Sequence, residues 1–131
     1  MKEYLELGKG NDRLHYPGFL NGEMMKRYMR AADLFIHPTR EDMWGLVINE
    51  AMAQGLPVIS TYGCIGAKEL IDEGVNGLLI PVDEVAPIVS GVTGLLSDPV
   101  RLRSMAEESI KRIHAYTIEE MVRAHRAVFG K

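Results

Sequence analysis

Short apolar runs alternate along the chain with polar segments rich in Gly, Asn and Pro. Asp33–His37, Pro57–Thr61 and Leu78–Ile80 are short apolar runs that predict strands. Arg13–Tyr16 predicts a further short strand before a Pro-Gly break. Leu46–Gln54 is apolar around most of its circumference and predicts a buried helix between two of the strands.

Helices are predicted between and after the strands. They are expected over Glu3–Leu7, Glu23–Ala32, Ala67–Asp72 and Val85–Leu96, from Asp98 onward, and from Thr117 to about Phe129. Asn21 is a suitable N-cap for the second of these helices. Thr117 and Glu120 have the spacing of a capping box, so a last, separate helix is predicted to begin there.

The alternation of strands and helices predicts an α/β fold, with a Rossmann-like parallel sheet, helices on both faces and a helical C-terminal tail. In such sheets a ligand binds beyond the carboxyl ends of the strands. We expect three loops to meet there: Pro17–Gly22, His37–Gly45 and Tyr62–Gly66.

The composition narrows the class of protein. The chain has 131 residues, enough for a single domain, and its formal charge of −3 argues against nucleic acid as a partner. One cysteine, Cys64, excludes an intramolecular disulfide and fits the cytoplasm. Cys64 is either a semi-buried loop thiol or a nucleophile. Neither a signal peptide nor an apolar run long enough for a membrane span is present in this sequence.

Two polar residues, Asn49 and Glu50, interrupt the apolar helix that follows the second loop. A carboxylate at that position needs a partner or an open cleft, because burying it alone is costly. Asp42 precedes Glu50 with seven residues between them, so the two carboxylates can flank one ligand. The N–H groups of Gly45 and Leu46, at the start of the helix, are suited to a phosphate. Alternatively, Asp42 and Glu50 only cap the helix and a neighbouring loop.

The stretch ADLFIHPTREDMWGLVINEAMAQGLPVIS closely resembles the donor-binding core of the family 4 retaining glycosyltransferases, which have the GT-B fold. The segments YPGFL and YGCIGAKELIDEGVNGLLIPV match further motifs of that family, so the resemblance covers about Leu14 to Val82. It implies that residues 1–131 form a single, incomplete C-terminal nucleotide-sugar-binding domain, half of a GT-B fold. The N-terminal acceptor domain is then absent.

The resemblance also implies roles for individual residues. Glu50 matches the second of two family glutamates and is expected to hold the donor ribose. Asp42 stands at the position of the first glutamate and is expected to contact the transferred sugar, with Glu41 as an alternative because the Asp side chain is shorter. Asp42 and Glu50 are therefore the implied catalytic residues. The other implied donor-binding residues are Trp44, Gly45 and Leu46 at the diphosphate, and Gly18 and Phe19 beside the nucleobase.

The implied activity is sugar transfer with retention, from a nucleotide diphosphate sugar to a hydroxyl of an acceptor glycan or lipid-linked glycan. Such polysaccharide biosynthesis needs no metal or other cofactor in this family. The family's basic pair, an Arg and a Lys that neutralise the diphosphate, has no counterpart before Leu14. We therefore expect the isolated chain to bind weakly and to catalyse little.

Several alternatives remain at this stage. The chain is a stand-alone nucleotide-binding or interaction module, or part of another GT-B enzyme such as an epimerase. His37 acts as a general base or fixes its loop by a hydrogen bond. The mildly basic C-terminal tail either contacts an anionic membrane surface, at the inner face of the membrane, or is a solvated helix face.

Overall fold

Three parallel strands form the sheet in this computed structural model, which describes Glu6 and residues 8–130. The strands β1 (Phe35–His37), β2 (Val58–Thr61) and β3 (Gly77–Ile80) lie in the order β1-β2-β3. Phe35 pairs with Val58, which in turn pairs with Gly77. The predicted parallel sheet is therefore confirmed.

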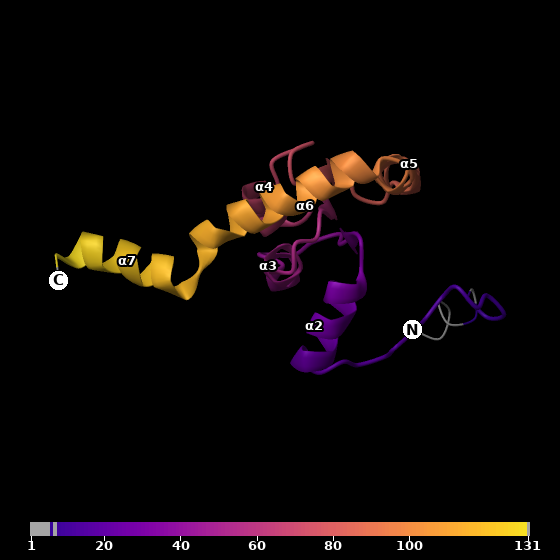
Figure 1. The fold of residues 1–131 in the computed structure, drawn as a ribbon, viewed down its shortest axis with the longest axis horizontal. Coiled ribbons are helices and arrows are strands. Elements are labelled where there is room, and N and C mark those ends of the chain that lie inside the picture. The colour runs from indigo at the N-terminus through magenta and orange to yellow at the C-terminus, as the bar shows by residue number, and fades with distance from the viewer. Residues whose placement is uncertain (1–5, 7, 131) are drawn as a thin grey trace.

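Helices connect the strands and continue after the last of them (Figure 1). α2 (Gly22–Ala31) precedes β1, α3 (Leu46–Ala53) joins β1 to β2, α4 (Ile65–Leu70) joins β2 to β3, and α5 (Val85–Leu96) follows β3. α6 (Pro99–Ile113), the short 3₁₀ helix η1 (His114–Tyr116) and α7 (Ile118–Phe129) form the C-terminal tail. Figure 1 shows α7 extending away from the other helices toward one end of the molecule.

Both faces of the sheet are covered, as predicted. Val58 and Ile59 are neighbours on β2, yet they belong to two different apolar clusters because successive strand residues point to opposite faces. Val58 packs with Ile48 and Met52 of α3, whereas Ile59 packs with side chains of α5 and α6. α6 packs against both α3 and α5 and so links the two layers.

Side-chain caps are present at three of the predicted helix starts. The side chains of Asn21, Asp98 and Thr117 each accept the backbone N–H of the third residue after them, at 3.0, 3.0 and 3.2 Å. Each cap satisfies one of the N–H groups that the first helical turn cannot satisfy itself. These local signals explain why three helix starts could be located from the sequence.

One predicted strand is wrong. Residues 13–16 are not a strand, and the Leu14 N–H makes a turn hydrogen bond to the Asn11 carbonyl at 3.0 Å. Leu14 and Tyr16 are both 48% exposed, so their apolar side chains do not mark a buried strand. The predicted helix over Glu3–Leu7 falls outside the described residues except for Glu6.

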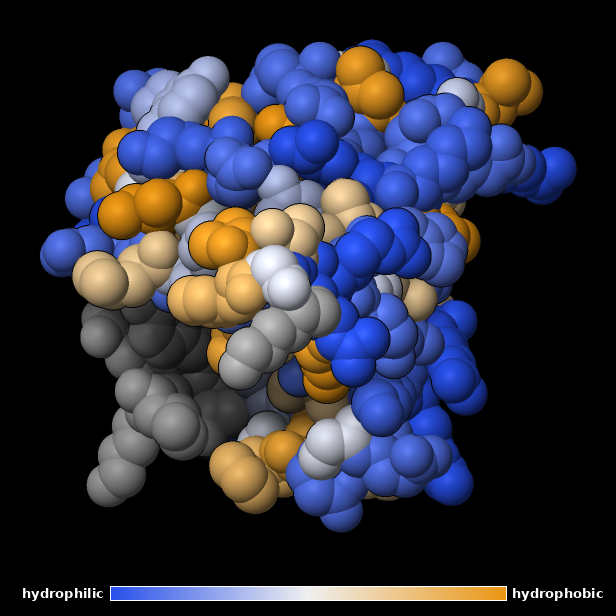
Figure 2. All heavy atoms as spheres, turned by 90° about the vertical axis from the view of Figure 1, so that its left-hand side faces the viewer, coloured by the Kyte–Doolittle hydropathy of each residue, from blue (hydrophilic) through white to orange (hydrophobic). Residues whose placement is uncertain are grey.

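The tail exposes apolar side chains. On α7 the exposed large apolar residues are Ile118, Met121, Val122, Val128 and Phe129. The space-filling view onto this end of the molecule shows apolar side chains beside hydrophilic ones (Figure 2). Among the described residues, no helix has both the length and the apolar composition needed to span a bilayer.

Candidate functional site

The loops that follow β1 and β2 are held side by side by backbone hydrogen bonds. The Asp42 N–H donates to the Gly63 carbonyl at 3.1 Å, and the Asp42 carbonyl accepts the Ile65 N–H at 3.0 Å. A Cβ at Gly63 would overlap the Arg40 carbonyl, so the backbones can approach this closely only with glycine there. The structure therefore brings together two of the three loops expected at the carboxyl edge of the sheet.

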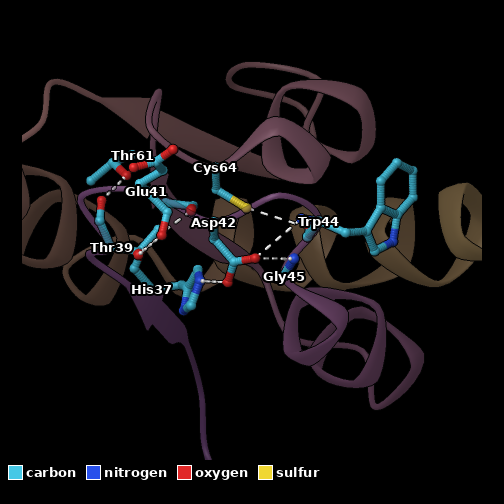
Figure 3. A network of polar contacts seen from close by, with 9 residues as sticks. His37, Thr39, Glu41, Asp42, Trp44, Gly45, Thr61 and Cys64 are labelled. Carbon is cyan, nitrogen blue, oxygen red and sulfur yellow. Dashed lines mark hydrogen bonds and ion pairs between the residues drawn. The ribbon is translucent and has the colours of Figure 1, made fainter.

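Asp42 is the centre of a small polar network (Figure 3). Its Oδ1 accepts the backbone N–H groups of Trp44 and Gly45, at 3.1 and 2.8 Å. Its Oδ2 lies 3.2 Å from Nε2 of His37 at the end of β1. The Trp44 N–H, followed by His37 and the Gly45 N–H, lowers the pKa of the Asp42 carboxyl against the opposing effect of partial burial.

Gly45 makes the turn into α3 possible. It has a φ of +70°, which disfavours any residue with a side chain, and a Cβ there would lie 2.8 Å from Sγ of Cys64. Its N–H is donated to Asp42 and is therefore engaged, contrary to the expectation that it points at a phosphate. The N–H groups of Leu46 and Val47, which have no acceptor within the helix, remain suited to that role.

Trp44 is fixed at both its indole and its backbone. The indole Nε1 donates to Oδ1 of Asn49 at 3.0 Å, which gives this polar residue on the apolar helix a partner. The Trp44 carbonyl accepts a weak hydrogen bond from the thiol of Cys64 at 3.4 Å. Cys64 itself is fully buried, more than the semi-buried loop thiol expected from the sequence.

Glu50 is exposed on the side of α3 that faces the C-terminal tail. It lines a hollow of about 340 Å³ together with residues of α3, α6, η1 and the residue after it. The other lining residues are Asn49, Ala53, Ile110, Ile113, His114, Tyr116 and Thr117. Because its carboxylate is solvated, Glu50 does not destabilise the helix. Asp42 and Glu50 thus have different surroundings, and the structure shows no direct contact between them within the described residues.

The remaining predicted donor residues lie at the surface. Phe19 is 98% exposed, and Gly18 before it has a φ of +70°, so this turn makes little contact with the rest of the described chain. Glu41 is exposed, and its carbonyl accepts the Thr39 hydroxyl at 3.0 Å. Leu46 is 71% exposed at the first position of α3.

The contact between His37 and Asp42 favours the loop-fixing interpretation of His37, since its ring nitrogen meets the loop carboxylate directly. The spacing of the histidines along the sequence did not indicate that His37 lies near two other side chains able to bind a metal. His37, Asp42 and Cys64 each offer one ligand atom, and the three atoms all lie within 4.8 Å of one another. The sequence feature that could have indicated this grouping is that His37 ends one predicted strand and Cys64 closely follows the next.

Known proteins are similar to this chain in sequence and in fold. The model of the family described as "Glycosyl transferases group 1" matches residues 1–98. The lipopolysaccharide core biosynthesis mannosyltransferase of Rhizobium meliloti is 35% identical over 106 residues, which are 78% of this chain and 30% of that protein. The sucrose-phosphate synthase of Thermosynechococcus elongatus has a TM-score of 0.84 and 25% identity, over 98% of this chain and 33% of that one.

A further solved structure is that of HepE from Anabaena in complex with UDP-glucose, with a TM-score of 0.75 and 28% identity over 86% of this chain and 30% of that one. The chain therefore spans about a third or less of the length of these relatives. The expected architecture, a Rossmann-like half of a GT-B fold with a helical tail, is confirmed by these similarities together with the parallel sheet.

Proposed function

This chain belongs to the group 1 glycosyl transferases, and we propose that it is the donor-binding part of an enzyme that transfers a sugar from a nucleotide diphosphate sugar to an acceptor hydroxyl. The observation that carries the proposal is the start of α3 at the carboxyl end of β1, with a glycine turn before it and the exposed carboxylate of Glu50 further along the same helix. The Anabaena relative solved with UDP-glucose supports a nucleotide sugar as the ligand class.

In this proposal the diphosphate and the ribose of the donor contact different parts of α3. The N–H groups of Leu46 and Val47 stabilise the diphosphate as negative charge develops on the leaving group. The Glu50 carboxylate accepts hydrogen bonds from the vicinal ribose hydroxyls. Asp42 supports the loop through Oδ1, which accepts the Trp44 and Gly45 N–H groups, and its Oδ2, which lies against His37, contacts the transferred sugar.

The finer parts of the proposal are carried over from the resemblance of the sequence to the family 4 retaining glycosyltransferases. Transfer proceeds with retention at the anomeric carbon and requires no metal, with a glycan or lipid-linked glycan as acceptor. The parent enzyme works in the cytoplasm, with peripheral contact to the membrane. An N-terminal domain closes over the donor and excludes water, so the 131-residue chain alone catalyses little.

Titration of the labelled chain with UDP, GDP, ADP and their sugars, followed by NMR, tests the donor site. We expect one nucleotide to shift the amide resonances of Gly45, Leu46 and Val47 in a saturable way. Glu50→Ala is expected to weaken this binding about tenfold, as the loss of a hydrogen-bonded carboxylate would.

Glu107→Ala, which removes an exposed carboxylate from α6, is the matched control and should bind as the unaltered chain does. The proposed donor site is wrong if no nucleotide shifts the resonances at the start of α3. It is also wrong if Glu50→Ala and Glu107→Ala bind the nucleotide equally well.

A further inference from the structure

The side chains of His37, Asp42 and Cys64 form a compact cluster with the chemistry of a metal site. Their ligand atoms, Nε2, Oδ2 and Sγ, all lie within 4.8 Å of one another, and Nε2 and Oδ2 are 3.2 Å apart. Ligand atoms around a tetrahedral zinc ion are separated by about 3.3–3.8 Å, given metal–ligand bonds of about 2.0–2.3 Å. The cluster therefore needs only a small contraction to hold an ion. We propose that His37, Asp42 and Cys64 bind Zn²⁺.

The backbone pre-organises the three ligands. His37 ends β1, and Cys64 precedes α4, whose first residue, Ile65, donates its N–H to the Asp42 carbonyl at 3.0 Å. Asp42 and Cys64 thus sit on backbones that pair directly in a parallel bridge. A Cβ at Gly45 would lie 2.8 Å from Sγ of Cys64 and 3.6 Å from Oδ2 of Asp42, so the glycine leaves space beside both ligand atoms.

The carboxylate of Asp42 is oriented for such a site. Its Oδ1 is occupied by the N–H groups of Trp44 and Gly45, which leaves Oδ2 directed at His37. Partners of this kind around a ligand fix its orientation and strengthen the metal site.

The donor set selects the ion. One imidazole, one thiolate and one carboxylate favour Zn²⁺, whereas Mg²⁺ and Ca²⁺ prefer oxygen ligands alone. The side chains of His37 and Asp42 are 20% and 34% exposed, so an ion can enter from their side although Cys64 is fully buried. On binding, the thiol of Cys64 loses its proton to solvent, and its weak hydrogen bond to the Trp44 carbonyl is replaced by a bond to the metal.

This inference goes beyond the proposed donor site and does not depend on it. A zinc ion at this cluster would occupy Oδ2 of Asp42, the atom that we assign to the sugar side of the site. Zinc is therefore expected to act against donor binding, while the transfer reaction itself uses no metal. Three protein ligands leave a fourth position for water.

Titration of the full 131-residue chain with Co²⁺, a coloured substitute for Zn²⁺, tests the site directly. We expect a thiolate-to-cobalt charge-transfer band and tetrahedral d–d bands that saturate at one ion per chain and disappear when Zn²⁺ is added. Cys64→Ser should abolish the charge-transfer band, and His37→Gln should weaken binding about tenfold or more.

His125→Gln, which alters a histidine on α7 that hydrogen-bonds the Met121 carbonyl, is the matched control and should leave the titration unchanged. NMR shifts in the unaltered chain on adding Zn²⁺ should be concentrated at His37, Asp42 and Cys64, a readout that does not require the variants to fold. The zinc site is wrong if no thiolate band forms, or if the Zn²⁺ shifts fall on other histidines.

Discussion

Oδ1 of Asp42 lies 2.8 Å from the backbone nitrogen of Gly45, so the residue at the position of a family glutamate also caps the loop that carries it. The short Asp side chain suits this geometry, because its carboxylate accepts hydrogen bonds from the backbone N–H groups of Trp44 and Gly45, two and three residues later in the chain. The two interpretations of Asp42 left open by the sequence are therefore compatible: Oδ1 fixes the loop, while Oδ2 lies against His37 and is the atom that we propose for a ligand.

The first prediction concerns the acidity of this carboxyl. The Trp44 N–H and His37 lower the pKa of Asp42, so its charged form stabilises the fold above the ordinary Asp value of about 3.9. That contribution should be lost as the pH falls through the lower, folded-state pKa. NMR titration of the side-chain carboxyl carbon measures the pKa, and thermal unfolding between about pH 5 and pH 2 measures the loss.

Asp42→Asn is the informative variant, because the amide oxygen can still accept both N–H groups but does not titrate in this range. Its stability should depend less on pH over this range than that of the unaltered chain. An ordinary or raised pKa for the Asp42 carboxyl would contradict the network as described.

The second prediction concerns the close approach of the two loops at Gly66. A Cβ there would overlap the Trp44 carbonyl, so Gly66→Ala must push the loops apart. We expect a loss of about 1–3 kcal/mol in the free energy of unfolding, and a shifted Trp44 fluorescence, because the indole is fixed by the same loop.

Gly94→Ala is the matched control, since it lies within α5 and an added Cβ meets nothing within 4 Å. It should be neutral or should stabilise the chain by up to about 1 kcal/mol, as alanine favours helix over glycine. Chemical denaturation of both variants tests the contrast, and equal stabilities would refute the close approach.

The third prediction concerns Asn76, which is 1% exposed and whose side-chain amide bonds two backbone groups of the preceding segment. Its Oδ1 accepts the Asp72 N–H at 2.9 Å, and its Nδ2 donates to the Leu70 carbonyl at 3.0 Å. Asn76→Ala leaves both groups unpaired and should cost about 2–4 kcal/mol. Asn76→Asp should cost more, because it places a carboxylate against the Leu70 carbonyl.

Asn11→Ala removes an exposed asparagine whose Oδ1 accepts a nearby backbone N–H, so it is the control for the loss of a turn hydrogen bond in solvent. It should change the stability by no more than about 0.5 kcal/mol. Urea unfolding measures the free energy of unfolding of the three variants. The role of Asn76 is refuted if its substitution lowers this free energy no more than Asn11→Ala does.

Features of the fold encoded by short stretches of sequence could be predicted. The caps at Asn21, Asp98 and Thr117 act over three residues, and the apolar β2 strand needs burial on both faces, so each can be recognised without tertiary information. The strand predicted over residues 13–16 is wrong because that prediction also rested on a local pattern alone. Leu14 matches a strand pattern locally, but no neighbouring strand pairs with that segment.

The site was harder to predict, because its contacts join different loops. Gly63 and Gly66 look like ordinary loop and helix residues until the neighbouring carbonyls of Arg40 and Trp44 are placed against them. The grouping of His37 with Cys64 likewise depends on parallel strands ending at one edge of the sheet. The orientation of Glu50 toward α6 and η1 depends on how the C-terminal tail packs, which no local pattern specifies.

The last prediction concerns Tyr116, which joins η1 to α4 through a hydrogen bond from its hydroxyl to Oε1 of Glu69 at 2.7 Å. This bond, together with partial burial, raises the pKa of Tyr116. A raised pKa stabilises the fold below the unfolded value of about 10, and the contribution is lost as the pH rises toward the folded value. Tyr116→Phe keeps the ring under the Arg112 guanidinium but removes the hydroxyl, and should cost about 1 kcal/mol at pH 7. The difference in stability between the two proteins, measured by urea unfolding, should shrink above about pH 10. A difference that stays constant up to pH values at which Tyr116 ionises would show that the hydroxyl does not act through Glu69.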